Sequence, residues 1–227
     1  MSMNEKETVD TRKNDARTEL VFILDRSGSM HGLEADTIGG FNRVIEENRK
    51  LPGECLVTTV LFDSELQRLH TRLPIAQVPA MTEQDYRPGG MTALLDAVGS
   101  TISELYWAEP APAYVQCVII TDGMENASRE YSLEKVRGMI TKTKAEKGWD
   151  FIFLGANIDA VSTAGRMGIS ADRAVTAMGD AEGVGLQYEA VSRANREFRS
   201  APQACRSTDW KSNVEADMHR RGGRKNR

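Results

Sequence analysis

Cysteine, histidine and aromatic residues are scarce in this chain of 227 residues. It has three cysteines and three histidines, and aromatic side chains make up 6% of the sequence. Cys55, Cys117 and Cys205 are odd in number and far apart, and the first two fall in apolar runs. We therefore expect buried free thiols rather than a disulfide framework or a zinc site, and a reducing compartment, the cytoplasm.

Long hydrophobic runs are also missing. The first ten residues, MSMNEKETVD, contain no apolar core of a signal peptide, and no stretch reaches the roughly 18 consecutive apolar residues of a membrane span. We therefore expect neither export nor a membrane anchor. The 40% hydrophobic content suffices for a sizeable core, and a net charge of -4 with 27% charged residues is typical of an ordinary globular chain. Bulk charge indicates no class of partner.

Strand-like and helix-like segments alternate along the chain. A continuous apolar run typical of a buried strand occupies residues 20–24, and further strand-like runs occupy residues 56–62, 115–120 and 151–154. Apolar residues at helical spacing occupy residues 38–45, 95–105, 133–140 and 184–198. This alternation predicts an α/β fold of the Rossmann-like, doubly wound type, in which helices cover both faces of a mostly parallel sheet.

The predicted domain has one exception to parallel pairing and two ends without a fold of their own. Asp63-Ser64 is too short for a crossover, so the segment near Glu65 to Arg72 is expected to return as an antiparallel edge strand. Residues 1–18 are polar and lack an apolar period, which indicates a flexible N-terminal segment. We place the domain at residues 19–200, and we interpret residues 201–227 as a polar and basic tail without a fold.

Polar side chains follow the predicted strands on separate loops. Asp25-Arg26-Ser27-Gly28-Ser29 comes directly after the first strand, and Thr121-Asp122-Gly123 follows another. The glycine-rich turn Pro88 to Ala93 leads into a helix and presents Thr92 from a third loop. In open α/β sheets, ligands bind beyond the carboxyl ends of the strands, where such loops converge. The sequence therefore predicts a site at this edge of the sheet.

The predicted ligands of that site all carry oxygen: Asp25, Ser27, Ser29, Thr92 and Asp122. Hard oxygen ligands without cysteine or histidine favour magnesium, with manganese or calcium as alternatives, over zinc or copper. Each residue also has a purely structural alternative. A serine after a strand often caps the next helix, and Asp-Gly often forms a turn.

These residues resemble the metal-ion-dependent adhesion site (MIDAS) of the von Willebrand factor A (vWA) family. That site reads Asp-x-Ser-x-Ser on one loop, Thr on a second and Asp on a third, and all five positions are filled here, within a resemblance from about Glu19 to Ser200. The resemblance is to the intracellular, stand-alone members of bacterial type.

The resemblance implies a division of roles within the site. Ser27 and Ser29 would bind the metal directly, Thr92 directly or through water, and Asp25 and Asp122 largely through waters. With mainly neutral ligands, the cation would keep enough charge to attract an Asp or Glu carboxylate of a protein partner. The implied function is a non-enzymatic adaptor for assembling complexes in the cytoplasm.

Other polar residues near these loops are expected to lie outside the metal set. We expect Asp96 and Glu125 to be solvated carboxylates. Arg26 and His31 are expected at exposed surface positions, and Asn157 and Asp159 on the rim of the site.

Two other functions are open at this point. A magnesium-dependent hydrolase or phosphotransferase would use the same metal, but the sequence has no phosphate-binding Gly-x-x-x-x-Gly-Lys motif and no Gly-x-Ser-x-Gly elbow. A nucleic-acid-associated scaffold would use the basic residues 218–227, for which a solvated end is the alternative. The resemblance also raises the hypothesis that the helix at residues 184–198 moves on metal and partner binding.

Overall fold

A six-stranded sheet forms the centre of the fold. The computed structural model describes residues 17–202 and 207–222, and its sheet has the strand order β3-β2-β1-β4-β5-β6. The strands are β1 (Thr18–Asp25), β2 (Cys55–Phe62), β3 (Leu66–Pro74), β4 (Tyr114–Thr121), β5 (Asp150–Ala156) and β6 (Ala174–Ala177). All neighbours pair in parallel except β2 and β3, which pair antiparallel. The predicted doubly wound α/β fold is confirmed.

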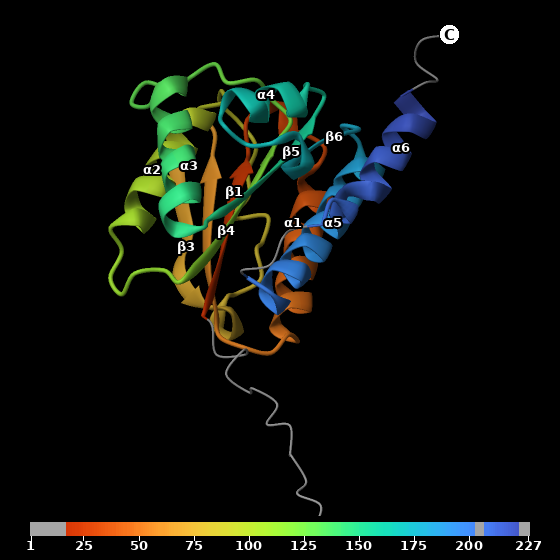
Figure 1. Ribbon diagram of the computed structural model, residues 1–227. Helices are drawn as coiled ribbons and strands as arrows, with labels where there is room; N and C mark the ends of the chain where they lie inside the picture. Colours follow the sequence, from red (N-terminus) through yellow and green to blue (C-terminus); the bar gives the residue numbers. More distant parts are fainter. Residues whose placement is uncertain (1–16, 203–206, 223–227) are drawn as a thin grey trace, which may run out of the picture.

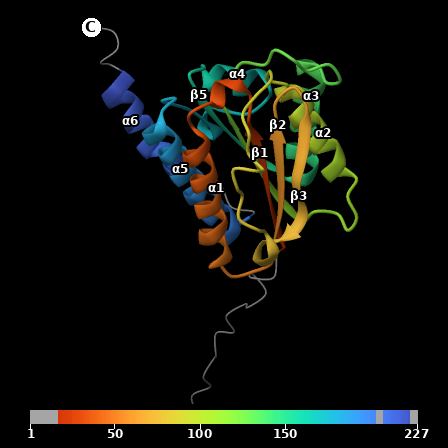
Figure 2. The same ribbon diagram turned by 180° about the vertical axis from the view of Figure 1, so that it is seen from behind.

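Helices cover both faces of this sheet (Figure 1). The α-helices are α1 (Glu34–Arg49), α2 (Leu94–Tyr106), α3 (Leu133–Lys147), α4 (Ala160–Arg166), α5 (Ala181–Ser200) and α6 (Ser212–Gly222). Short 3-10 helices are η2 (Gly28–Met30), η3 (Ile75–Gln77), η4 (Ala171–Arg173) and η5 (Asp209–Lys211). Figure 2 shows α1, α5 and α6 on one side of the sheet and α2 and α3 on the other.

The central strand β1 separates two hydrophobic cores. All eight of its residues are buried, and because side chains alternate across a strand, they divide between the two faces. Phe22 packs edge-on against Phe41 of α1, with ring centroids 5.4 Å apart. Val21 and Ile23 belong to the other core, which α2, α3 and α4 cover. The continuous apolar run in the sequence follows from this burial on both faces.

The edges of the sheet were predicted only in part. The antiparallel edge strand is confirmed as β3. The sequence interpretation missed β6 and α4, which have four and seven residues, because so short a strand or helix has no readable period. No helix among residues 17–202 and 207–222 is long and apolar enough to cross a membrane.

The prediction of an unfolded tail is wrong for residues 207–222. Trp210 is 0% exposed, its indole Nε1 donates to the carbonyl of Asp172 at 3.0 Å, and Val214 of α6 is buried beside it in the same core. The sequence signal is weak, because Trp210, Val214 and Met218 recur every four residues but form only a narrow apolar stripe in a polar stretch, and the sequence interpretation missed it. Residues 203–206 and 223–227 lie outside the described residues, as do residues 1–16 of the predicted N-terminal segment.

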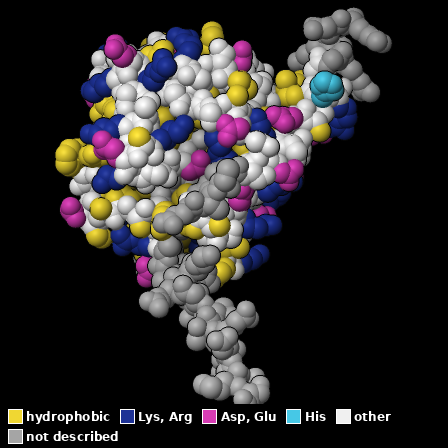
Figure 3. Space-filling view, viewed as in Figure 1, with side chains coloured by type: hydrophobic (Ala, Val, Ile, Leu, Met, Phe, Trp, Pro, Cys, Tyr) yellow, Lys and Arg dark blue, Asp and Glu magenta, His cyan; other side chains and the backbone are white. Residues whose placement is uncertain are grey.

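The basic residues of α6 pair with acidic neighbours. Arg221 binds Asp217 in its own helix and Asp180 at 2.7 Å, and Arg220 binds Glu182 at 2.7 Å. Bonds from Arg221 and Arg220 to the Asp217 carboxyl hold its pKa below its usual range. Figure 3 shows basic and acidic side chains interspersed over this face of the molecule. The part of α6 that the sequence suggested for nucleic-acid binding is therefore largely charge-compensated.

Docking of the C-terminal helix predicts a clear contrast between two tryptophans. We expect Trp210→Ala to lower the free energy of unfolding by about 3–5 kcal/mol, because it empties a filled core position. Trp107→Ala removes a side chain that is 78% exposed, and we expect it to change stability by no more than about 1 kcal/mol. Urea unfolding followed by circular dichroism measures both values. Equal losses for the two variants would contradict the packing of Trp210.

Candidate metal centre

Three loops meet at one edge of the sheet. Asp25 is the last residue of β1 and Asp122 follows the last residue of β4, and these neighbouring strands run parallel. The third loop precedes α2 and is tied to the first by two backbone hydrogen bonds, Gly28 N to Gly90 O at 3.1 Å and Gly89 N to Arg26 O at 2.9 Å. The topology therefore places all three predicted loops together.

The carboxylate of Asp25 is the buried anchor of this edge. The residue is 1% exposed. Its Oδ1 accepts the backbone N–H of Ser27 at 2.7 Å, and its Oδ2 accepts the hydroxyl of Thr121 at 2.5 Å. The buried Tyr86 hydroxyl donates to the Asp25 backbone carbonyl. Asp25 is thus held from β4, from its own loop and from the segment before Thr92.

The two motif serines bond to each other and to Asp122. Ser27 Oγ lies 3.1 Å from Ser29 Oγ, and Ser29 Oγ donates to Asp122 Oδ1 at 2.5 Å. Neither hydroxyl caps a helix: Ser27 precedes η2 without a side-chain bond to it, and α1 begins only at Glu34. The structural alternative of a serine cap is therefore wrong. Ser27 is buried and Ser29 is exposed, so the chain of hydroxyls opens to solvent.

Gly123 leaves room for three hydroxyls. A Cβ atom on this residue would lie 2.7 Å from Thr92 Oγ1, 3.4 Å from Ser29 Oγ and 3.6 Å from Ser27 Oγ. Real Cβ contacts are not found at the first of these distances, so only glycine fits here without a shift of Thr92. Three hydroxyls from two loops therefore converge on one small space beside the Asp122 carboxylate of the third loop. This cradle fits a small cation bound by oxygen atoms.

The cradle has an excess of negative charge. Burial raises the pKa of the Asp122 carboxyl, and the neighbouring Asp25 carboxylate raises it further, although the Ser29 hydrogen bond lowers it. Arg26, the basic residue of the motif, pairs instead with Asp63 at 2.9 Å. Within residues 17–202 and 207–222 no cationic side chain pairs with Asp25 or Asp122, and two such buried carboxylates favour a positively charged ligand. Among the described residues no three His, Cys, Asp or Glu side chains form a metal cluster, so this cradle depends on its hydroxyls.

Asn126 fixes the backbone of Thr92. The Thr92 N–H donates to Asn126 Oδ1 at 2.9 Å, and the Asn126 N–H donates back to the Thr92 carbonyl at 3.0 Å. Glu125 adds a bond from the Leu95 N–H to its Oε2 at 2.8 Å. The loop after β4 is therefore joined to the start of α2, which sets the position of the Thr92 hydroxyl.

Asp96 and Glu125 are not the solvated carboxylates that the sequence predicted. Asp96 is buried, and its carboxylate accepts the backbone N–H groups of residues 129, 130 and 131 at 2.8–2.9 Å. Glu125 accepts three N–H groups, those of Leu95, Ala127 and Ser128. Sequence spacing missed these roles because the N–H donors belong mostly to an irregular loop, whose path no periodicity reveals.

The remaining polar candidates lie around the site. Among the described residues, none of them bonds to the five predicted ligands. His31 is exposed beside Glu34, as predicted for a surface residue. Arg26 is partly buried by its pair with Asp63 and its bond to Gln67, so its prediction as an exposed residue is wrong. Asp159 caps α4 by accepting the Ser162 N–H at 3.0 Å.

Several residues of the site escaped sequence reasoning. Thr121 and Gly123 flank Asp122. Their residue types were a usable signal, because threonine offers a hydroxyl to Asp25 and glycine allows the close approach of Thr92. Tyr86 and Asn126 carry no such signal, because their contacts span 61 and 34 positions of the chain.

No family model and no curated protein sequence matches the chain. Solved structures do share its fold. A von Willebrand factor type A protein from Catenulispora acidiphila is 14% identical, with a TM-score of 0.58 over 80% of this chain and 43% of that one. The vWF domain of the pilus tip protein Mfa5 from Porphyromonas gingivalis is 10% identical, with a TM-score of 0.59 over 86% and 99%.

A third similar structure is the proximal thread matrix protein 1 of the mussel byssus, with a zinc-occupied MIDAS motif. It is 15% identical, with a TM-score of 0.59 over 80% of this chain and 46% of that one. The matched region thus spans less than half of the mussel and Catenulispora chains. At these identities the comparisons establish the fold, and the fold is that of von Willebrand factor A domains.

Proposed function

We propose that this chain is a metal-dependent protein-binding module of the vWA type. The hydroxyls of Ser27, Ser29 and Thr92, with the carboxylates of Asp25 and Asp122, would hold a divalent cation. The observation that carries this proposal is the space beside Gly123, on which hydroxyls from two loops converge next to a buried carboxylate. A coincidental set of turns and caps would not require glycine at that point.

The donor set favours magnesium, with manganese or calcium as alternatives. It consists of hydroxyl and carboxylate oxygens, which hard cations prefer. The zinc-occupied MIDAS motif of the mussel protein supports a divalent cation in a fold of this kind. When bound, such a cation supplies a positive charge that attracts the carboxylate of an Asp or Glu on a protein partner. Exposed Ser29 marks the side from which that carboxylate would approach.

An adaptor role is favoured over hydrolysis by the positions of the histidines. His70 is buried in β3 against Thr59, at 3.0 Å, and burial lowers its pKa. His31 is exposed beside Glu34, and His219 lies on α6. We find no histidine bonded to the cradle among the described residues. Cys55 and Cys117 are free and buried, in keeping with a proposed reducing compartment, the cytoplasm.

Removing one exposed hydroxyl tests the metal proposal directly. We expect Ser29→Ala to weaken Mg²⁺ binding about 10- to 100-fold in calorimetric titration, because a donor of the cradle is lost. Ser162→Ala, at an exposed position of α4, is the matched control and should bind as the unchanged protein does. Equal affinities for the two variants would sink the assignment of Ser29.

Filling the cradle tests its geometry. A methyl group at position 123 meets Thr92 Oγ1 at 2.7 Å, so Gly123→Ala should weaken Mg²⁺ binding at least about tenfold. Gly39→Ala is the control, because position 39 of α1 is exposed and a Cβ there meets nothing within 4 Å. Thermal unfolding with and without Mg²⁺ gives a second reading, since a ligand at a hundredfold its Kd stabilises by about 2.7 kcal/mol. A magnesium-induced stabilisation that survives Gly123→Ala unchanged would refute this geometry.

Partner capture should depend on the metal and on the cradle together. We expect a protein from the native cell to be retained by the immobilised chain with Mg²⁺, and to be lost with a chelator and with Ser29→Ala. Quantitative mass spectrometry of the eluates obtained with Mg²⁺, with chelator and with Ser29→Ala identifies this partner. Ser162→Ala is the reference. A partner retained equally under all conditions would show that the cradle does not bind it.

A further inference from the structure

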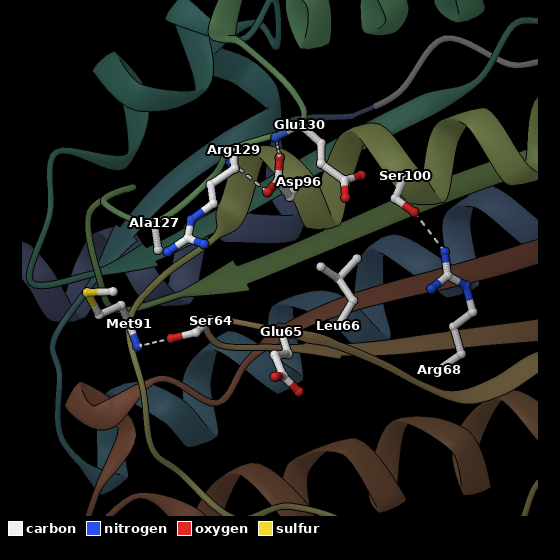
Figure 4. Close-up of a pocket in the computed structure, with 10 residues that line it drawn as sticks. All are labelled: Ser64, Glu65, Leu66, Arg68, Met91, Asp96, Ser100, Ala127, Arg129 and Glu130. Atoms are coloured by element: carbon white, nitrogen blue, oxygen red, sulfur yellow. Dashed lines mark hydrogen bonds between the residues drawn. The ribbon is translucent and has the colours of Figure 1, made fainter.

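A second hollow lies beside the candidate metal centre. Its volume is about 570 Å³, within the range of ligand sites. Figure 4 shows its lining from β3, the loop before α2, the start of α2 and the loop after β4. Ser64, Met91, Ala127 and Arg129 form one end, and Arg68 and Ser100 lie at the other. None of these side chains belongs to the cradle.

Arg129 brings an uncompensated positive charge to this hollow. Its backbone N–H binds Asp96, but its exposed guanidinium forms no ion pair or hydrogen bond within the part of the chain that the structure describes. Figure 4 shows this group turned toward Ala127, Met91 and Ser64. Arg68 is different, because it already binds Glu104 at 2.5 Å and Ser100 at 2.7 Å. Arg129 is therefore the guanidinium available to a ligand here.

The acidic residues of the hollow leave that end free for an anion. Asp96 is occupied by three backbone N–H groups. Figure 4 shows the carboxylates of Glu65 and Glu130 away from the Met91 end, with that of Glu130 directed toward Ser100. A carboxylate beside Arg129 would therefore meet a guanidinium and an apolar side chain at this end of the hollow.

Met91 connects the hollow to the cradle. It is 51% exposed and immediately precedes Thr92, whose backbone is bonded to Asn126 of the loop that also carries Arg129. Its own N–H is fixed by Ser64 Oγ at 2.9 Å. A large exposed apolar side chain next to a candidate metal ligand favours contact with a partner, because methionine adapts to varied apolar surfaces.

We propose that the protein partner carries two acidic side chains separated by an apolar one. The first reaches the metal at the cradle, the apolar side chain packs on Met91, and the second carboxylate binds the guanidinium of Arg129. This inference rests on the proposed function. It adds the chemistry of the partner segment, for which bidentate Arg–carboxylate pairing gives both register and specificity.

Selection of peptides on the full chain tests this proposal. A phage library of random peptides of about twelve residues is bound to the immobilised protein with Mg²⁺ and eluted with a chelator. We expect the eluted peptides to share two acidic positions around an apolar residue. Arg129→Glu should weaken the synthetic peptides about five- to tenfold, and replacing their second acid by lysine should restore binding to that variant. Arg43→Glu, at an exposed position on α1, is the matched control and should leave affinity unchanged.

The outcomes separate the two proposals. Peptides that need Mg²⁺ and Ser29 but bind equally to Arg129→Glu and Arg43→Glu would overturn the second contact and leave the proposed function standing. A single shared acidic position would do the same. If no peptide is released by chelator, or if Ser29→Ala binds the peptides as before, the proposed function fails and this inference fails with it.

Discussion

The whole candidate site depends on two carboxylates that the sheet brings together. Parallel pairing of β1 with β4 places Asp25 and Asp122 at neighbouring strand ends, where both are largely withdrawn from water. Burial raises the pKa of the Asp122 carboxyl, and the like charge of Asp25 raises it further, so keeping both carboxylates ionised at this edge has a cost. Thr121 and Ser29 offset part of it by hydrogen bonding. In the proposed function, a cation between the loops would offset more of it.

A second set of carboxylates holds the loops without taking part in the cradle. Asp96 and Glu125 accept backbone N–H groups from opposite sides of the junction between α2 and the loop after β4. Because irregular loops lack their own ladders of hydrogen bonds, such side chains satisfy N–H groups that would otherwise need water. These bonds join the loop after β4 to the start of α2, next to Thr92.

The same feature of the sequence predicted both the sheet and the positions of the five proposed ligands. Strands buried on both faces leave continuous apolar runs, and the polar residues directly after them must lie at one edge. Sequence reasoning failed where contacts are long-range and carried by single residues. Trp210 anchors η5 and α6 from a polar segment, and Asn126 reaches Thr92 across an irregular loop. The Asn126 contact leaves no period or motif, and the apolar spacing of Trp210, Val214 and Met218 is a weak signal within its polar segment.

The chemistry of the cradle and that of the neighbouring hollow are complementary. Hydroxyl ligands leave a bound cation with net positive charge, which attracts a carboxylate but does not distinguish one acidic protein from another. Discrimination has to come from side chains around the metal, because specificity is a difference between affinities. Met91 and Arg129 lie on the two loops that carry Thr92 and Asp122, and bonds to Ser64 and Asp96 hold their backbones. In the proposed function, a partner that binds only the metal would leave an exposed apolar side chain and a guanidinium unmatched beside it, and this mismatch would be the physical basis for selecting among acidic partners.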